Sequence, residues 1–407
     1  MSLRLHPTSI ASSEPLRVRV LRALRIRARR ASGWSAKALE YGRYVRRQRA
    51  YRRWASQINR HRVEVFVGPN LDTFGGIRHH IHAIEKYSCQ KVGLVPNDAV
   101  LQLLAFDGGT EDFVKWFKAA RFPALRAVHS HVDPWFIYWC KKQQKSGVRW
   151  IHTYHLNYFP EHAKAELLPW QKEFNHALLN DARHADVRIS TSRWQQDDLG
   201  RAHGIETLYL PTGVDVALCD QADANRFHKR IGDDPFVLYV GRNAPVKNPA
   251  DFARLAACLP ELQFVMIGQG LTPEVLRTEW QVDPLGNLLV YGSTSRDQVQ
   301  DAIAACSALV VTSKREGQPT LVLEAMVHGR PIVVPDEAGC METIGEGDFG
   351  FIYRQGDLDD LVRKTLLALG NNEKGKRARR RVLAEYDWHV IAPKLDAIYR
   401  GEAAISE

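Results

Sequence analysis

The sequence predicts an α/β fold made of two doubly wound parallel-sheet domains. From residue 62 onward, short β-branched apolar runs alternate with longer helical stretches, a pattern typical of parallel strands covered on both faces. The runs fall into two series, and a chain of 407 residues has room for roughly two to three domains. A hydrophobic content of 45% and a charged content of 25% are ordinary for a globular protein and exclude wholesale disorder.

Eleven apolar runs are expected to form the strands. They span residues 63–68, 91–95, 127–129, 150–153, 187–190 and 207–210 in the first half, and 236–240, 264–267, 288–291, 308–311 and 331–334 in the second. A polar, Asp-rich stretch at 215–234 separates the two series. Ligands of such sheets bind at the carboxyl ends of the strands, so we expect the loops that follow the strands to carry the chemistry.

The positive charge of the chain is concentrated at its N-terminus. A net charge of +10 over the whole chain suggests a nucleic-acid-binding protein. Residues 1–60, however, hold sixteen basic and two acidic residues, a net charge of +14, while the remaining 347 residues hold 40 basic and 44 acidic residues, a net charge of −4. The basic excess therefore belongs to an N-terminal extension on a slightly acidic body, and we expect no nucleic-acid partner.

Two loops that follow strands of the second half carry candidate binding residues. The first begins with Gly241 and places Arg242 and Lys247 at the carboxyl end of a strand, where two cations suit a pair of phosphates. The alternative is a solvated loop. The second loop begins at Gly268 and lacks the third glycine of a dinucleotide fingerprint, so we interpret it as a tight turn that brings backbone close to a ligand.

A third loop leads into a helix and is the most informative. Pro319 suits the first turn of this helix, and the free N–H groups near Gln318 and Thr320 would form an anion site beside the two cations. Glu316 precedes the helix and Glu324 lies about a turn and a half inside it. Carboxylates so placed can accept hydrogen bonds from vicinal sugar hydroxyls. The alternative is that Glu324 only pairs with a neighbouring arginine.

Taken in order, these motifs resemble those of the family 4 retaining glycosyltransferases of the GT-B fold. The shared features are the Gly-Arg-x4-Lys-Asn loop from Gly241, the Phe-x3-Gly-x-Gly turn ending at Gly270, the Glu-x7-Glu pattern from Glu316 to Glu324, the Gly-x-Pro-x-Val strand from Gly329 and the closing segment at 386–399. They recur over about 165 residues, from Phe236 to Arg400. The first half resembles the family more loosely, through Phe74-Gly75-Gly76-Ile77 and Thr153-Tyr154-His155.

The resemblance implies a fold and roles for named residues. The fold is GT-B: two Rossmann-like doubly wound domains facing a cleft, with a basic helical extension at 1–60, an acceptor domain at 61–220, a nucleotide-sugar donor domain at 221–385 and a helix at 386–407 that returns toward the first domain. Arg242 and Lys247 would contact the diphosphate, Glu324 the ribose, and Glu316 and His155 the transferred sugar. The backbone that would approach the donor lies at Gly75, Gly76, Gly241, Gly268, Gln318, Pro319 and Thr320.

The implied reaction transfers a sugar from a UDP- or GDP-linked donor to an acceptor hydroxyl and retains the anomeric configuration. The acceptor would be a glycan or a lipid-linked molecule in cell-envelope polysaccharide, lipopolysaccharide or glycolipid synthesis. Because Arg242, Lys247 and a helix N-terminus can stabilise the leaving diphosphate, we expect no metal and no cofactor besides the donor substrate. The chain has neither a signal-like apolar run nor a C-x-x-C pair, which indicates a cytoplasmic protein.

Two other function classes stay open at this point. His129, His131 and Asp133 have the H-x-H-x-D spacing of a binuclear metal hydrolase, although Pro134 replaces the usual next histidine. The other alternative is a non-catalytic sugar- or partner-binding protein on the same fold. For His155, the alternative to a site role is a satisfied core or helix-capping histidine.

The extension contains a candidate membrane-binding helix. Trp34, Ala38, Tyr41 and Val45 recur at helical spacing among arginines, as expected of a basic amphipathic helix on an anionic bilayer. We therefore expect residues 1–60 to bring the protein to the inner face of the cytoplasmic membrane as a peripheral protein. The alternatives are a helix docked on the body and a solvated tail.

Overall fold

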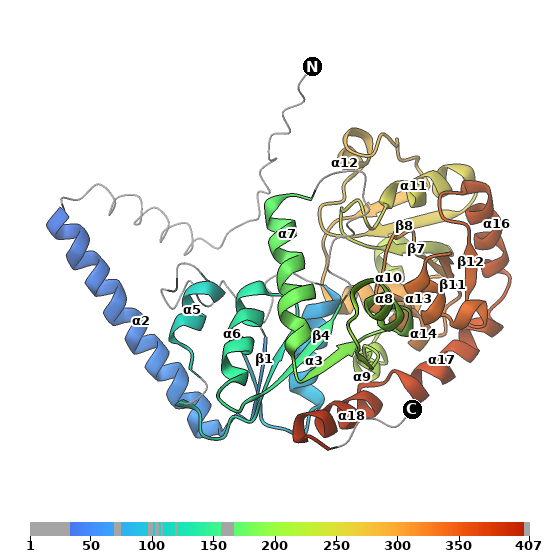
Figure 1. Ribbon diagram of the computed structural model, residues 1–407. Helices are drawn as coiled ribbons and strands as arrows, with labels where there is room; N and C mark the ends of the chain where they lie inside the picture. The colour runs from blue at the N-terminus through green and yellow to red at the C-terminus, as the bar shows by residue number, and fades with distance from the viewer. Residues whose placement is uncertain are drawn as a thin grey trace.

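The computed structural model describes residues 33–68, 75–96, 101, 106, 109–118, 121–155 and 167–402, with side chains described from residue 39. Within these residues, two six-stranded parallel sheets lie beside each other, and helices cover them (Figure 1). The predicted fold of two doubly wound domains with an N-terminal helix is therefore confirmed. We keep the element numbers of Figure 1 throughout.

The first domain is built on the sheet with strand order β2-β1-β3-β4-β5-β6. Its central strands are almost entirely buried because helices cover both faces of the sheet. The strands are β1 (Val65–Gly68), β2 (Val92–Leu94), β3 (Ala127–Ser130), β4 (Arg149–Tyr154), β5 (Val187–Ser190) and β6 (Leu208–Tyr209). The helices are α3 (Gly76–Tyr87), α5 (Thr110–Trp116), α6 (Pro134–Gln144), α7 (Pro169–Asn175) with its continuation η2 (His176–Asp181) and η3 (Ala182–His184), and α8 (Arg193–His203).

The second domain has the strand order β12-β11-β10-β7-β8-β9. Its strands are β7 (Phe236–Val240), β8 (Gln263–Ile267), β9 (Leu288–Tyr291), β10 (Ala308–Val310), β11 (Ile332–Pro335) and β12 (Phe351–Tyr353). Its helices are α9 (Val216–Cys219), α10 (Ala224–Ile231), α11 (Pro249–Cys258), α12 (Pro273–Thr278), α13 (Arg296–Ala305), α14 (Thr320–Val327), α15 (Ala338–Thr343), η4 (Gly345–Gly347), α16 (Leu358–Leu369) and α17 (Glu373–Glu385). The sequence did not predict β12, a short edge strand that pairs with β11.

The last described helix, α18 (Trp388–Arg400), packs on the first domain although it follows the second in sequence. Trp388 and Leu395 are buried in the same cluster as Val65 of β1. The chain crosses between the domains twice, and the two crossings are joined by a bridge between Val214 and Asp387. This arrangement fixes the two sheets relative to each other on either side of the site described below.

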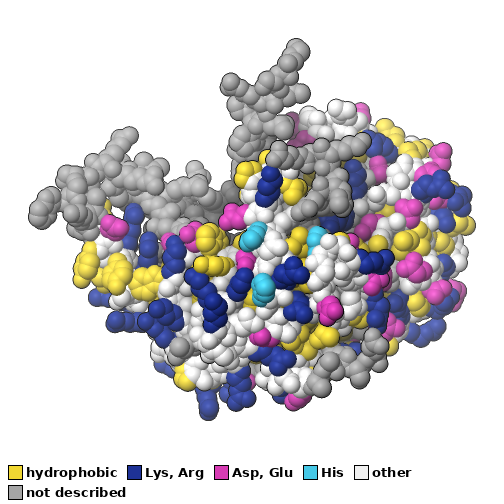
Figure 2. All heavy atoms as spheres, in the orientation of Figure 1, with side chains coloured by type: hydrophobic (Ala, Val, Ile, Leu, Met, Phe, Trp, Pro, Cys, Tyr) yellow, Lys and Arg dark blue, Asp and Glu magenta, His cyan; other side chains and the backbone are white. Residues whose placement is uncertain are grey.

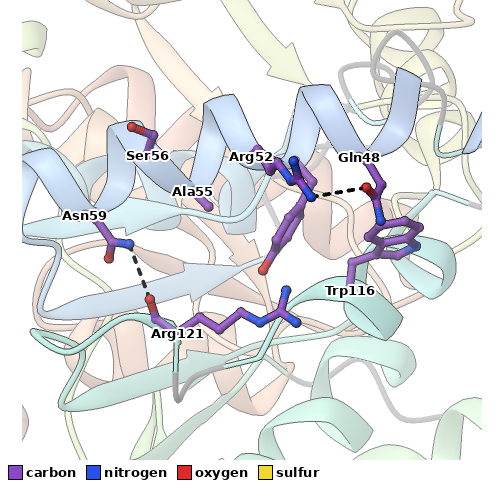
Figure 3. A pocket seen from close by; sticks show the side chains of 8 residues that line it. Gln48, Arg52, Ala55, Ser56, Asn59, Trp116 and Arg121 are labelled. Carbon is purple, nitrogen blue, oxygen red and sulfur yellow. Dashed lines mark hydrogen bonds between the residues drawn. The ribbon is translucent and has the colours of Figure 1, made fainter. Parts of the chain in front are cut away.

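Helix α2 (Gly33–His61) runs along the edge of the first domain (Figure 1), and its second half is docked there. Tyr51 is buried, and Trp54 and Ile58 pack against the same core, where Trp54 stacks on Phe66 with ring centroids 5.7 Å apart. A hollow of about 530 Å³ lies beside this contact, and Asn59 and Arg121 are among the residues that line it (Figure 3). The side-chain amide of Asn59 donates a hydrogen bond to the carbonyl of Arg121 at 3.3 Å. For this half of the helix, docking on the body is the observed arrangement.

The described side chains in the first half of α2 present a different surface. Leu39, Tyr41 and Tyr44 are exposed, Tyr41 by 69%, and Val45 is half-buried. On the side of the molecule where α2 lies, Figure 2 shows hydrophobic side chains next to lysines and arginines. Trp34 and Ala38 of the predicted stripe lie outside the described side chains. Among the described residues, no helix has the length and apolar character needed to span a membrane.

Candidate active site

A cavity of about 880 Å³ lies between the two domains, at the carboxyl ends of their strands. The sequence-predicted residues come from loops that are far apart in the chain, yet all of them line this one cavity. They are Gly75, Gly76, His155, Gly241, Arg242, Lys247, Gly268, Glu316, Gln318, Pro319, Thr320 and Glu324. The structure therefore brings the candidate residues together, and their roles toward a ligand stay predictions.

The loop after β7 holds its two cations differently. Lys247 donates from Nζ to Oε1 of Glu316 at 2.5 Å, so the lysine and the first carboxylate of the Glu-x7-Glu pattern form a half-buried ion pair. Thr312 fixes the loop by donating from Oγ1 to the Lys247 carbonyl at 3.1 Å. Arg242 has no hydrogen-bond or ion-pair partner among the described residues, although it lines the cavity. It is therefore a guanidinium available to an anion in the cavity.

Close contacts explain two of the predicted glycines, Gly268 and Gly76. A Cβ atom on Gly268 would lie 1.7 Å from the carbonyl oxygen of Gly241, so the turns after β8 and β7 can touch only without a side chain. Gly76 begins helix α3 in the first domain, and its Cβ would lie 3.2 Å from Oγ1 of Thr320. This second contact crosses the cavity and sets the glycine loop against the N-terminus of α14.

Helix α14 places Glu324 at the base of the cavity. Pro319 directly precedes the helix, as its fixed φ favours, and Glu324 lies in the second turn with only 9% exposure. Burial raises the pKa of the Glu324 carboxyl, and the Arg296 guanidinium 3.5 Å away opposes this shift. Glu324 thus has an arginine neighbour, as the alternative interpretation expected, and also lines the cavity.

Positive charge dominates the cavity wall. The charged residues that line it are the basic Arg78, Arg242, Lys247, Arg296 and Arg315 and the acidic Glu316 and Glu324. Five cations facing two carboxylates leave an excess of positive charge in a partly enclosed space, where electrostatic attraction is less screened than in bulk water. A ligand that carries two negative charges or more is the natural complement of this wall.

His155 contacts a second histidine rather than a helix end. Its Nε2 lies 3.0 Å from Nδ1 of His131, within hydrogen-bond distance. Burial lowers the pKa of both imidazoles well below the ordinary value, so both are neutral at pH 7. A neutral imidazole on the cavity wall can hydrogen-bond to a sugar without adding charge.

The H-x-H-x-D segment does not form the expected set of metal ligands. His129 is fully hydrogen-bonded, from Nδ1 to the Tyr399 hydroxyl at 2.6 Å and from Nε2 to Oγ1 of Thr153 at 2.8 Å. The Asp133 carboxylate accepts the backbone N–H of Phe136 at 2.6 Å and so caps helix α6. The interpretation as a binuclear hydrolase site was wrong, because two of its three residues hold the fold together.

Contacts between the domains surround the Glu316 loop. Nε1 of Trp194 donates to the Gly317 carbonyl at 2.9 Å, and Oε1 of Gln318 accepts the backbone N–H of Thr212 at 2.6 Å. The Glu342 carboxylate accepts the N–H groups of residues 193 and 194 at 2.8 and 2.9 Å. The side-chain amide oxygen of Gln318 thus links the two domains, while the predicted role of its backbone N–H toward a ligand stays a prediction.

Sequence analysis missed several residues of the wall, including Arg78, His79 and Arg296. Arg296 begins α13 after β9, so it too follows a strand of the second sheet, and this position was the available signal. Arg78 and His79 lie one turn into α3, where nothing in the sequence separates them from surface residues. Burial and the nearby Arg296 and Arg78 lower the pKa of His79 to about 4, so it also faces the cavity as a neutral group.

The fold and this cavity define a class: two-domain α/β proteins with a positively charged cavity between two parallel sheets. Comparisons with known proteins place the chain within that class. A family model described as "Glycosyl transferases group 1" matches residues 220–383, and one described as "Glycosyltransferase Family 4" matches residues 52–218. The chain belongs to the GT-B glycosyltransferases of the family 4 type.

Individual relatives are distant. The sulfoquinovosyl transferase SQD2 of Arabidopsis thaliana is 30% identical over 40% of this chain and 32% of its own. A phosphatidyl-myo-inositol mannosyltransferase of Propionibacterium freudenreichii is 26% identical over 55% of this chain and 58% of its own. The chain thus spans about a third to three-fifths of these two relatives. The crystal structure of Anabaena Alr3699/HepE in complex with UDP-glucose shares the fold, with a TM-score of 0.66 and 18% identity over 83% of this chain and 99% of the other.

Proposed function

We propose that this protein is a retaining glycosyltransferase that moves a sugar from a nucleoside diphosphate sugar to an acceptor hydroxyl. The observation that carries the proposal is the cavity wall, where Arg242 and Lys247 lie beside the N-terminus of α14 and the carboxylates of Glu316 and Glu324. Cations and a helix N-terminus suit a diphosphate, and carboxylates suit sugar hydroxyls. The domain matches and the UDP-glucose complex of the structural neighbour support the same donor class.

In the proposed mechanism, negative charge develops on the leaving diphosphate as the bond to the sugar breaks. Arg242, the Lys247 ammonium and the first N–H groups of α14 stabilise that charge without a metal. The acceptor hydroxyl attacks from the face that the diphosphate leaves, and the leaving phosphate oxygen takes the hydroxyl proton. Glu316, which is paired with Lys247, orients the sugar, and Glu324 accepts hydrogen bonds from the ribose.

We further propose an acceptor in cell-envelope glycan or glycolipid synthesis. The mannosyltransferase relative is named for a lipid acceptor, phosphatidyl-myo-inositol, which supports this class. Contact of the extension with the inner face of the cytoplasmic membrane is part of the same proposal. Its support is the exposed surface at the start of α2, where Leu39, Tyr41 and Tyr44 lie beside exposed arginines such as Arg46.

A thermal-shift screen of the purified protein against UDP- and GDP-linked sugars tests the proposal. One nucleotide sugar is expected to raise the midpoint of unfolding, because a ligand that binds only the folded state stabilises it. The shift is expected to disappear in Arg242→Ala, and Arg277→Ala, which changes an exposed arginine of α12 outside the cavity wall, is the matched control. A wild-type protein that no donor stabilises, or an equal shift in Arg242→Ala, contradicts the proposal.

A further inference from the structure

Three histidines, two of them buried and one half-buried, meet beside the cavity in the first domain. His80 comes from α3, His131 directly follows β3 and His155 directly follows β4. Each contributes one ring nitrogen, and these three nitrogens lie within 4.8 Å of one another. We call them the three-histidine cluster. They are spread over 76 positions, so although His131 and His155 were each singled out in the sequence, nothing there indicated that they meet or that His80 joins them.

The spacing of the rings matches a tetrahedral metal site. The ring centroids are 5.5 Å apart for His80 and His131, 5.0 Å for His80 and His155, and 5.2 Å for His131 and His155. With Zn–N distances of about 2.0–2.1 Å, each ring centroid lies about 3.2 Å from the metal, and tetrahedral angles then separate the centroids by about 5.2 Å. The backbone therefore already holds the three rings at the required separations.

Unsatisfied nitrogens provide a second, independent observation. His80 is 6% exposed, and neither of its ring nitrogens has a hydrogen-bond partner among the residues that the structure describes. Nε2 of His131 is also buried without a partner. His131 and His155 already contact each other, Nδ1 to Nε2 at 3.0 Å. Buried polar atoms are almost always paired, so the unpaired nitrogens of His80 and His131 beside this contact indicate something that the cluster binds. By contrast, His129 nearby has partners for both nitrogens.

We propose that His80, His131 and His155 bind one divalent transition-metal cation of the zinc class. Neutral imidazoles are ligands for Zn²⁺, Co²⁺, Ni²⁺ and Cu²⁺ rather than for Mg²⁺ or Ca²⁺, which prefer oxygen. Three protein ligands leave a fourth position, and His155 lines the cavity, so this position opens toward it. Small rotations of the imidazole rings bring the nitrogens from separations of up to 4.8 Å to the about 3.4 Å of a bound site.

The three-histidine cluster lies in the first domain, whereas Arg242 and Lys247, which are proposed to bind the diphosphate, belong to the second domain. The sequence led us to expect no metal, because Arg242 and Lys247 can neutralise the diphosphate; the metal site proposed here departs from that expectation. Cation binding is measured on the protein without any sugar donor. Failure of the three-histidine cluster to bind metal would therefore leave the proposed transfer reaction intact, and failure of transfer would leave the metal site intact.

The test titrates untagged, full-length, metal-stripped protein with Co²⁺ and then with Zn²⁺. We expect one equivalent of Co²⁺ to give the visible absorption of a tetrahedral site and Zn²⁺ to displace it. His80→Phe fills the same space beside Trp388 and removes one ligand, so the affinity is expected to fall about 100-fold or more. His82→Ala lies on the same helix, outside the cluster, and is expected to bind like the wild type.

A wild-type protein that takes up no Co²⁺, or His80→Phe protein that binds as tightly as the wild type, would overturn the proposal. If His80→Phe fails to fold, X-ray absorption spectroscopy of the zinc-loaded wild type counts the imidazole ligands of the metal and so tests the proposal. Three imidazole ligands support the site, and fewer than three contradict it.

Discussion

Glu342 joins the two domains through a single carboxylate, and its removal is predicted to open the cavity. The two oxygens accept the first backbone N–H groups of α8, from Arg193 at 2.8 Å and Trp194 at 2.9 Å. The carboxylate also lies at the positive end of that helix dipole. Because Trp194 in turn donates to the Gly317 carbonyl, the same contact holds the loop that carries Glu316.

The size of the effect follows from these two bonds. A hydrogen bond to a charged group contributes about 1.5–3 kcal/mol, and the lower end applies because both partners are partly exposed to water. Opening the domains solvates the freed N–H groups of α8, which offsets part of the loss. We therefore expect Glu342→Ala to destabilise the closed arrangement by about 2 kcal/mol, roughly a 30-fold change in the ratio of closed to open molecules. Glu342→Gln keeps a neutral acceptor and is expected to destabilise the closed arrangement by about half as much.

The two exposed cysteines allow a direct measurement. Cys89 follows α3 in the first domain and Cys258 ends α11 in the second, whereas Cys140, Cys219, Cys306 and Cys340 are buried. Spin labels or dyes on the two exposed thiols therefore report the distance between domains in the otherwise unchanged chain. Double electron–electron resonance should show a longer and broader distance distribution in Glu342→Ala than in the wild type, with Glu342→Gln between them.

A distribution that does not change in Glu342→Ala would refute this reasoning. Asp348→Ala is the matched control, because it removes an exposed carboxylate of the same domain that makes no hydrogen bond or ion pair with the described residues of α8. An equal change in that control would assign the effect to net charge rather than to the two hydrogen bonds.

Three further predictions concern catalysis, acid stability and membrane contact. Lys247→Ala should lower the rate of transfer by about 100- to 1000-fold, measured as release of nucleoside diphosphate, and an unchanged rate would remove Lys247 from the mechanism. Burial lowers the pKa of His152 to about 3, whereas the unfolded residue titrates near pH 6.5. Between these two pH values the unfolded chain binds one more proton than the folded chain. The free energy of unfolding should therefore fall by about 1.4 kcal/mol, from this residue, for each unit that the pH is lowered below about 6.5. Urea unfolding between pH 7.5 and 5.5 checks it, and a His152→Phe protein with an undiminished slope would contradict it. Arg46→Gln with Arg49→Gln should weaken sedimentation with anionic vesicles while donor hydrolysis continues, and equal sedimentation would argue against membrane contact.

The fold was predictable because its strands are buried on both faces. Continuous apolar runs such as residues 236–240 leave little choice of structure, and all eleven predicted runs contain strands. Strand β12 (Phe351–Tyr353) was missed because Gly345, Gly347 and Gly350 precede this short apolar run and give the segment the pattern of a loop. The arrangement of the N-terminal extension was harder to predict. Its helix carries apolar side chains both in the stripe at 34–45 and on the face that includes Tyr51 and Trp54. Only the folded body determines which of two such faces is covered.

The candidate site was predictable where the chemistry coincides with a position after a strand. Arg242, Lys247 and Glu316 are marked in this way by glycine turns and a helix start. Glu342 and the three-histidine cluster were not predictable, since their contacts depend on how separate elements approach one another in space. The docked half of α2 also changes how membrane contact should be tested. Deleting residues 1–60 would remove Tyr51 and Trp54 from the core of the first domain, so substitutions on the exposed face of the helix test membrane contact without disturbing the fold.

The central claim is retaining transfer from a nucleoside diphosphate sugar, and the anomeric configuration of the first product tests it most directly. Proton NMR can follow the slow hydrolysis of an α-linked donor by the purified protein, before the released sugar mutarotates, without knowledge of the acceptor. The proposed mechanism predicts that the α-anomer appears first, and that Glu316→Gln releases little of it. Initial release of the β-anomer would contradict the mechanism.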